Sequence, residues 1–242
     1  MKPRYIIIAA ILGLAVAAFL APALSPSPLD GLTNWGLTSA VLVSLAIGGF
    51  FFEFERRAAG SKEIALVAIL GALSAVVRIP FAAIPSVQPS TYLIICTGYV
   101  FGAVPGFMVG ALTALVSNLF LGQGPWTVYQ MFSWGLVGAA ASYLGRFHPG
   151  RKGLVVFGVI SGYVFGAIMN LWFWASLVYP LTPHTFLVSW LASVWFDTAH
   201  AIGNAVFLGL FGGKTIALLE RFRRKFQWGR APAEPAYDLG PE

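Results

Sequence analysis

Three polar side chains stand inside one of the most apolar stretches of the sequence, WFDTAHAIGNAVFLGLF at residues 195–211. Asp197, His200 and Asn204 are spaced i, i+3 and i+7, which places them on one side of a helix at successive turns. An Asp that faces lipid costs several kcal/mol, so this side should face the interior of a helical bundle. Two hypotheses fit the pattern. The three side chains form a network that only sets helix register, or they serve in binding or coupling.

Amide side chains beside indole rings occur twice more. Asn170 has Trp174 one turn away in MNLWFWAS, and Asn118 in SNLFLGQGPW is followed by further amide and indole groups. Aromatic belts at membrane interfaces explain some of the tryptophans without a ligand, but buried amides need hydrogen-bond partners. Apolar and aromatic walls with a few placed polar groups are typical of a small-molecule pocket. The sequence therefore predicts a pocket that opens outward.

Arg78 lies at the outer end of a predicted helix, on the side opposite to every other basic residue. It either reaches inward to pair with Asp197 or extends to the external headgroups. The segment that begins with it, residues 78–89, contains three prolines, which prevent a continuous helix. Two more outer loops, 122–127 and 179–184, combine proline with amide or aromatic side chains. Stiff loops over a bundle predict a lid or binding rim, because their shape is partly set before a ligand arrives.

The scatter of the reactive side chains argues against catalysis. The three histidines and the single Cys96 lie in different segments without the spacing of a metal centre, so neither a metal nor a cofactor is predicted. Ser117 or Ser193 with His200 supplies a Ser–His pair but lacks the glycine-flanked setting of a nucleophile. No Walker-type phosphate loop occurs in the sequence. We therefore expect a protein that is not an enzyme and has no catalytic residues.

Composition indicates an all-α membrane protein. Of the 242 residues, 58% are hydrophobic and 10% are charged, whereas a soluble domain carries about 25% charged residues. A helix that crosses the hydrocarbon core needs about 20 mostly apolar residues. The sequence predicts eight such spans, of which the fourth is short. The predicted spans are Tyr5–Leu24, Leu32–Phe52, Glu63–Ile79, Pro89–Phe101, Val104–Leu121, Val128–Leu144, Gly153–Val178 and Thr185–Phe211.

The basic residues predict the orientation. With eight spans, every Lys and Arg except Arg78 falls on one side, which is the cytoplasmic side when loops are short. We therefore expect a multi-pass protein of the bacterial inner membrane with both termini in the cytoplasm. The net charge of +6 follows from this topology, so no nucleic-acid partner is predicted. Residues 1–24 imitate a signal peptide, but a long apolar run and Pro22 in the cleavage triplet favour a retained span.

The character of the chain changes near residue 60. Residues 1–60 are expected to form two simple helices, residues 61–222 a six-helix functional core, and residues 223–242 a basic and polar cytoplasmic tail. The first core helix, KEIALVAILGALSAVVRIP, contains two overlapping small-xxx-small pairs, which let another helix approach closely in a bilayer. The pairs are Ala68 with Ala72 and Gly71 with Ala75. They form either an internal packing face or a docking face for another membrane subunit.

Three segments carry a resemblance to a known family, namely IPSVQPSTYLIICTGYVFGAVPGFMVGALTALVSNLFLGQGPWTVYQMFSWGLVG, GAIMNLWFW and FDTAHAIGNAVF. Over residues 61–222 the chain resembles the substrate-binding S components of energy-coupling factor (ECF) vitamin transporters. The two extra N-terminal helices depart from the usual six. The resemblance implies a six-helix membrane subunit that captures a vitamin or vitamin precursor from outside. It also implies a transmembrane coupling subunit and two ATPase subunits on separate chains.

The same resemblance implies where the substrate binds, in the outer loops and the outer halves of the later helices. Arg78 and Asn204 are expected to support the side chains that contact the ligand. Ala68 and Ala72 match the family's small-residue motif on the first core helix and are expected to dock the coupling subunit. The residues expected to contact the ligand or to support that contact are Gln88, Asn118, Gln123, Trp126, Gln130, Asn170, Trp174, Asp197 and His200.

The identity of the ligand and the mode of transport leave several hypotheses open. The resemblance favours a cobamide or cobamide precursor, with riboflavin and other flat heterocycles as alternatives. A rival hypothesis is a self-contained, proton-coupled secondary transporter of a small molecule, in which Asp197 and His200 form a proton relay. A third is a purely structural membrane scaffold. It predicts that Asp197→Asn and Asn170→Ala change stability without affecting any ligand.

Overall fold

The computed structural model describes residues 35–56 and 60–225, and every element in these ranges is a helix. The all-α prediction is therefore confirmed. The predicted span Tyr5–Leu24 lies outside the described residues, so two N-terminal helices before a six-helix core remain a prediction. The elements are α2 (Trp35–Arg56), α3 (Ser61–Phe81), α4 (Ser90–Phe101), α5 (Ala103–Leu121), α6 (Trp126–Phe147), α7 (Gly150–Leu177), α8 (Pro183–Phe207), the π-helix η1 (Leu208–Gly212) and α9 (Gly213–Lys225).

Four helices of the described part are long and apolar enough to cross a bilayer. They are α3, α5, α7 and the continuous helix Pro183–Lys225, which α8, η1 and α9 form together. The last predicted span ended at Phe211, where the sequence becomes polar, but the helix runs on to Lys225. It continues because α9 packs against α4 and buries Ile216 and Leu219 there.

The short helix α4 lies at the centre of the bundle and contacts α5, α6 and α9. It is apolar around most of its circumference, which is typical of a helix that other helices surround. Its Gly98 meets Gly106 of α5 and Gly138 of α6, and a Cβ on any of the three would overlap the backbone of a neighbour. The three glycines therefore allow backbone-to-backbone packing at the centre of the bundle.

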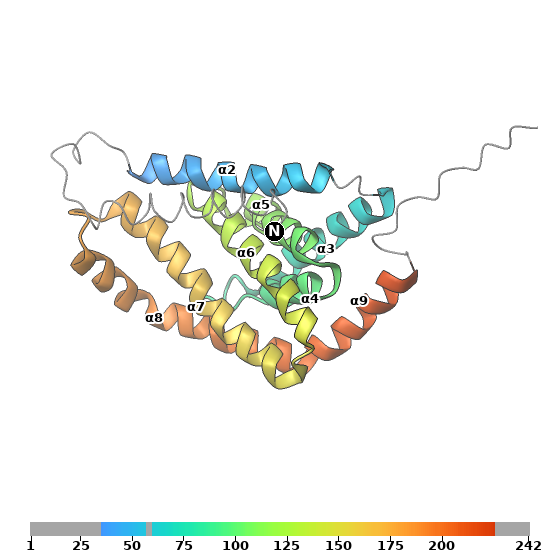
Figure 1. Ribbon diagram of the computed structural model, residues 1–242. Coiled ribbons are helices and arrows are strands. Elements are labelled where there is room, and N and C mark those ends of the chain that lie inside the picture. Colours follow the sequence, from blue (N-terminus) through green and yellow to red (C-terminus); the bar gives the residue numbers. More distant parts are fainter. Residues whose placement is uncertain (1–34, 57–59, 226–242) are drawn as a thin grey trace, which may run out of the picture.

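Helices α7 and α8 form a long pair that lies side by side (Figure 1). Gly158, Gly162 and Gly166 recur every fourth residue along α7 and face α8 and its continuation η1. A Cβ on each would overlap Leu208 of η1, Ala201 and Asp197 in turn. The glycines bring the two helices into close contact and leave space for a carboxylate between them.

Helix α2 lies across α5, α6 and α7 (Figure 1). Its buried side chains, Val43, Ala46, Ile47 and Phe50, follow the i, i+3, i+4, i+7 pattern of a helix face that packs on a core. The ring of Phe50 stacks on Phe107 of α5 with centroids 3.7 Å apart. Helix α2 is therefore packed against the bundle through the face that these four residues form.

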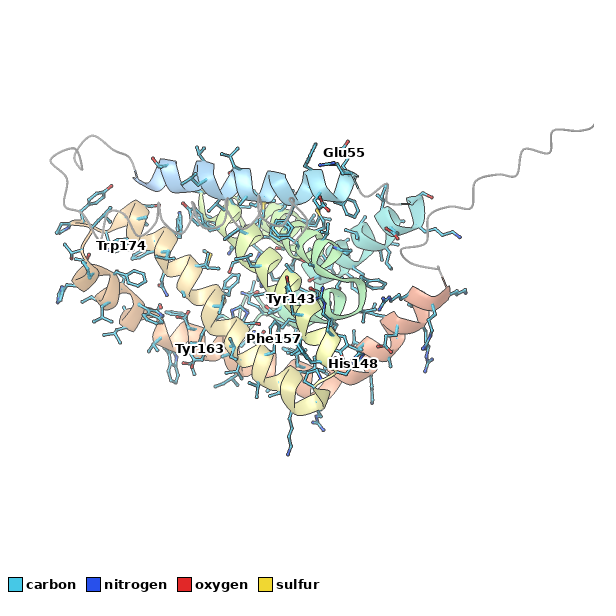
Figure 2. All side chains as sticks on the ribbon, viewed as in Figure 1. Glu55, Tyr143, His148, Phe157, Tyr163 and Trp174 are labelled. Atoms are coloured by element: carbon cyan, nitrogen blue, oxygen red, sulfur yellow. The ribbon has the colours of Figure 1, made fainter. Side chains whose placement is uncertain are left out.

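Short connections make consecutive helices from α3 to α8 run in alternating directions. The segments 82–89, 122–125 and 178–182 thus join helices at one end of the bundle, which we term the loop end. Figure 2 shows Trp174 near the loop end and His148, between α6 and α7, at the opposite end. The predicted outer loops all belong to the loop end.

Candidate functional site

A buried arginine organises the polar side chains beneath the loop end. Arg78, in the last turn of α3, is only 7% exposed. Its Nε donates to Gln88 Oε1 at 3.1 Å, and its Nη1 donates to Ser117 Oγ at 2.6 Å and to Asn118 Oδ1 at 2.7 Å. The guanidinium lies 4.8 Å from the ring centroid of Trp134. Arg78 therefore joins α3 to the following loop, to α5 and to α6.

These contacts correct both expectations for Arg78. It does not extend to the headgroups, because it is buried, and its hydrogen bonds go to neutral side chains rather than to Asp197. The physical reason is that α3 packs on α5, which carries hydrogen-bond acceptors at the depth of the guanidinium. We term Arg78, Gln88, Ser117 and Asn118, with the amide and hydroxyl groups described next, the arginine cluster.

Asn118 extends the arginine cluster to α6. Its Nδ2 donates to Thr127 Oγ1 at 3.0 Å and to Gln130 Oε1 at 2.8 Å. The Thr127 hydroxyl donates in turn to Gln123 Oε1 at 2.9 Å, and Gln123 Nε2 donates to the carbonyl of Leu115 at 2.9 Å. Four of the amides that the sequence singled out thus lie in one connected network, namely Gln88, Asn118, Gln123 and Gln130.

His200 reaches the same region from α8. Its Nε2 lies 2.8 Å from Thr91 Oγ1, which also accepts a hydrogen bond from Trp134 Nε1 at 3.0 Å. The ring of Phe165 packs against both aromatic partners, with centroids 4.9 Å from His200 and 4.8 Å from Trp134. His200 is 2% exposed. Because Trp134 also contacts Arg78, His200 connects to the arginine cluster through Thr91 and Trp134.

Asp197 belongs to a second group, which we term the aspartate cluster. Its Oδ2 accepts from Ser193 Oγ at 3.1 Å and from Asn170 Nδ2 at 3.4 Å, and Asn170 Nδ2 also donates to Ser193 Oγ at 2.6 Å. The side chain of Asp197 is 6% exposed and occupies the space left by Gly166. Its hydrogen-bond partners in the described part of the chain are neutral. The cluster joins α7 to α8.

The three predicted polar residues of α8 thus form hydrogen bonds with different neighbouring helices. Asp197 faces α7, His200 faces α4, and Asn204 donates from Nδ2 to the carbonyl of Gly158 at 3.1 Å. Within the described residues no hydrogen bond joins Asp197 to His200. The residues share one side of a helix, as their spacing predicts, but α8 packs against both α7 and α4, so that side meets two sets of partners.

Two of the predicted tryptophans occupy different settings. Trp126 is partly exposed and meets Trp172 edge to face, with ring centroids 6.0 Å apart. The ring of Tyr129 also packs against Trp172, with centroids 6.2 Å apart. Trp174 is 1% exposed, and its Nε1 already donates to Thr185 Oγ1 at 2.9 Å. Trp174 therefore stabilises the start of α8, whereas Trp126 keeps an accessible ring surface.

Sequence reasoning missed several residues of the two clusters and of the link between His200 and the arginine cluster. Thr91, Thr127 and Trp134 were not among the predicted site residues, because hydroxyl and indole groups are common in membrane helices and carry no distinct spacing. Ser117 and Ser193 were considered only as partners of His200. They bond instead to Arg78 and to Asp197, while His200 bonds to Thr91. The sequence held one signal that could have pointed to Ser117, because its hydroxyl stands one residue before Asn118, an amide that was already predicted to belong to the site.

The two small-residue pairs of α3 face different ways. Gly71 and Ala75 are buried, and a Cβ on Gly71 would lie 2.9 Å from Cβ of Leu112 on α5. Ala68 and Ala72 are exposed on the surface of the bundle. One pair therefore packs α3 within the bundle, and the other remains accessible. The docking role of Ala68 and Ala72 stays a prediction.

Comparison with known proteins relates most of the bundle to one family. A family model described as the substrate-specific component of ECF transporters matches residues 62–213, which include both polar clusters and leave α2 outside. No curated protein and no solved structure matches the chain.

Proposed function

The chain belongs to the family of substrate-specific components of ECF transporters, and from this premise we propose that it captures a vitamin or vitamin precursor at the loop end of its bundle. Components of this family work with coupling and ATPase subunits and are parts of a transporter rather than enzymes. The chain is a multi-pass membrane protein. We further propose that it resides in the bacterial inner membrane with both termini in the cytoplasm, so that the loop end faces outward.

The observation that carries this proposal is the arginine cluster. Burying a cation and several amides in an apolar bundle is costly, and a polar network that only held helices together would not need a charge. The network lies directly under two of the loop-end connections, since Gln88 and Gln123 belong to them. Polar groups gathered beneath loops at one end of a bundle are the expected arrangement of a site that takes its ligand from that end.

Unused hydrogen-bonding groups support the same conclusion. Trp172 Nε1 and Ser133 Oγ are buried and have no hydrogen-bond partner in the described part of the chain. Buried polar atoms are normally satisfied, so a bound ligand would supply the missing partners. Trp172 also packs beside Trp126 and Tyr129. An aromatic wall with amide groups nearby favours a flat heterocycle, and we propose a cobamide-related compound as the first candidate.

The proposed site includes the residues of both clusters. Asp197 and Asn170 would contact the ligand or hold α7 and α8 in the arrangement that binds it. His200 would have the same role, acting through its contact with Thr91. Trp174 and Asn204 would support α7 and α8, because their donor groups are used by Thr185 and Gly158.

Native mass spectrometry of the full chain, purified from its own membranes, tests the proposal. We expect a bound small molecule that copurifies at one copy per chain and whose removal and re-addition can be followed by calorimetry. In liposomes the purified chain should bind this molecule but accumulate none of it, because the energy source lies on other chains.

Proton-driven accumulation without an ATPase subunit would contradict the proposal and support the secondary transporter that uses Asp197 and His200. Failure of the chain to bind any small molecule, with Asp197→Asn and Asn170→Ala changing only stability, would support the scaffold hypothesis.

A further inference from the structure

The charge of Arg78 has no opposite charge beside it. Its partners Gln88, Ser117 and Asn118 are neutral, and in the described part of the chain no carboxylate pairs with it. A guanidinium stays protonated in proteins, so it cannot avoid the cost of burial by losing its proton. The ring of Trp134 and the carbonyl end of α3 offset part of this cost. Neither replaces an anion, because buried charges in proteins are normally paired.

One nitrogen of the guanidinium, Nη2, also has unused donors. The group has five N–H donors. Nε donates to Gln88, and Nη1 donates to Ser117 and Asn118, which uses three of them. The two donors on Nη2 have no acceptor among the described residues. The two N–H groups on Nη2 point in different directions, and each can donate a charge-assisted hydrogen bond to an oxygen of a carboxylate or a phosphate.

The surrounding contacts hold the guanidinium, and with it Nη2, in place. Asn118 is itself held by Thr127 and Gln130, and Gln123 holds Thr127 in turn. The acceptors that orient Arg78 therefore have little freedom of their own. A donor group that is oriented before the ligand arrives loses less entropy on binding. Asp197, a buried carboxylate of α8, is held by Ser193 and Asn170 rather than by Arg78.

We propose that Arg78 is the anion subsite of the substrate site, where the Nη2 donors bind a carboxylate or phosphate group of the captured molecule. This inference rests on the proposed function and narrows it, because it requires a substrate that carries a negative group. The phosphate of an anionic lipid headgroup offers the same chemistry, so the experiment must separate the two sources.

The first experiment uses the wild-type chain in nanodiscs of phosphatidylcholine. Calorimetry compares matched probes that differ in one anionic group: riboflavin with riboflavin 5′-phosphate, nicotinamide with nicotinate, pantothenol with pantothenate, and biotinamide with biotin. The anionic member of at least one pair should bind about 100-fold more tightly than its neutral partner, since a buried charge pair contributes that much when one partner is lost. Tight binding of a neutral probe, with no gain from its anionic partner, would overturn the inference and leave the proposed function intact.

Should no probe bind, the small molecule found by native mass spectrometry decides the question. A molecule with a carboxylate or phosphate supports the inference. A neutral molecule overturns the inference but leaves the proposed function intact. If no molecule copurifies and no probe binds, the proposed function and the inference fall together.

The second experiment separates recognition from folding. Arg78→Gln should weaken binding of the anionic probe about 100-fold and bring its affinity close to that of the neutral partner. Arg78→Lys keeps the charge but loses the planar guanidinium that Gln88, Ser117 and Asn118 orient, so its affinity should fall between the two. Arg146→Gln is the control, because Arg146 is exposed at the opposite end of α6 and lies over Tyr143. Equal weakening of both probes in the Arg78 variants would show that Arg78 only supports the fold. If Arg78→Gln does not fold, the test uses Arg78→Lys and the ratio of the affinities of the wild-type chain for the anionic and the neutral probe.

A third arm replaces phosphatidylcholine by phosphatidylglycerol. If the subsite serves the substrate, the anionic probe should still bind with little change in affinity. If phosphatidylglycerol instead abolishes probe binding in the wild type, and raises its unfolding temperature but not that of Arg78→Lys, the subsite belongs to a lipid headgroup and the substrate assignment is overturned.

Discussion

At the scale of single residues, Thr91 illustrates how the polar groups of this bundle depend on one another. Its hydroxyl oxygen accepts the indole N–H of Trp134 and lies within hydrogen-bond distance of His200 Nε2. All three side chains are buried. One hydroxyl therefore satisfies two aromatic side chains that would otherwise lack a partner in an apolar interior, where an unsatisfied group is costly.

Replacing Thr91 by Val removes this hydroxyl at nearly constant volume. The substitution should lower the free energy of unfolding by about 2 kcal/mol, because it leaves buried groups of Trp134 and His200 without a partner. Thr97→Val is the matched control on the same helix, since the Thr97 hydroxyl donates only to the carbonyl of Leu93 in its own helix. Chemical unfolding in detergent measures both. Equal effects of the two substitutions would contradict the bridging role of Thr91.

At the scale of elements, the pair of α7 and α8 depends on glycines. Gly158, Gly162 and Gly166 let the two helices approach closely, and the last of them leaves space for the carboxylate of Asp197. In a bilayer such small residues favour helix association through close packing, because lipid is as apolar as the side chains it would replace. The aspartate cluster therefore exists only as long as the two helices remain this close.

Gly166→Ala should force α7 and α8 apart or displace Asp197 from its bonds to Ser193 and Asn170. Overpacking of this kind costs about 1–3 kcal/mol, which should appear as a lower unfolding temperature in detergent. Gly209→Ala is the control, because a Cβ there would meet Val155 at 3.6 Å, an ordinary van der Waals contact. A Gly166→Ala protein as stable as wild type would show that this helix pair has room to spare.

At the scale of the whole molecule, the exposed face of α3 is the feature on which the docking prediction rests. Gly71 and Ala75 are used inside the bundle, whereas Ala68 and Ala72 remain on the surface. Small exposed residues four positions apart allow a helix of another membrane protein to approach closely. Substrate capture and subunit docking would then use different parts of the same helix, since Arg78 lies at its loop end.

Ala68→Leu or Ala72→Leu should weaken association with the coupling subunit about 10-fold or more, because the larger side chain separates the helices. Ligand binding should stay within about 2-fold of wild type. Ala140→Leu on α6 is the control, since Ala140 is also exposed but lies on another helix. Co-purification of the subunits from membranes measures the effect. Unchanged co-purification of both α3 variants would remove the docking hypothesis.

Sequence alone determined the all-α class, the family and most of the helix bounds. These properties depend on the length of apolar runs and on local motifs such as GQGPWT, which can be read without knowing which helices are neighbours. It also identified Gln88, Asn118, Gln123 and Gln130 as polar groups in need of partners, and the structure brings these four into one network.

Only the tertiary structure decided which partners these groups have. The spacing of Asp197 and His200 placed them on one side of α8, but the packing of that side against both α7 and α4 gave them separate partners. Arg78 met neutral oxygens of α5 and the adjoining loop instead of Asp197. A side chain of a membrane helix bonds to whatever the adjacent helix presents at the same depth, and that depends on the arrangement of all the helices together.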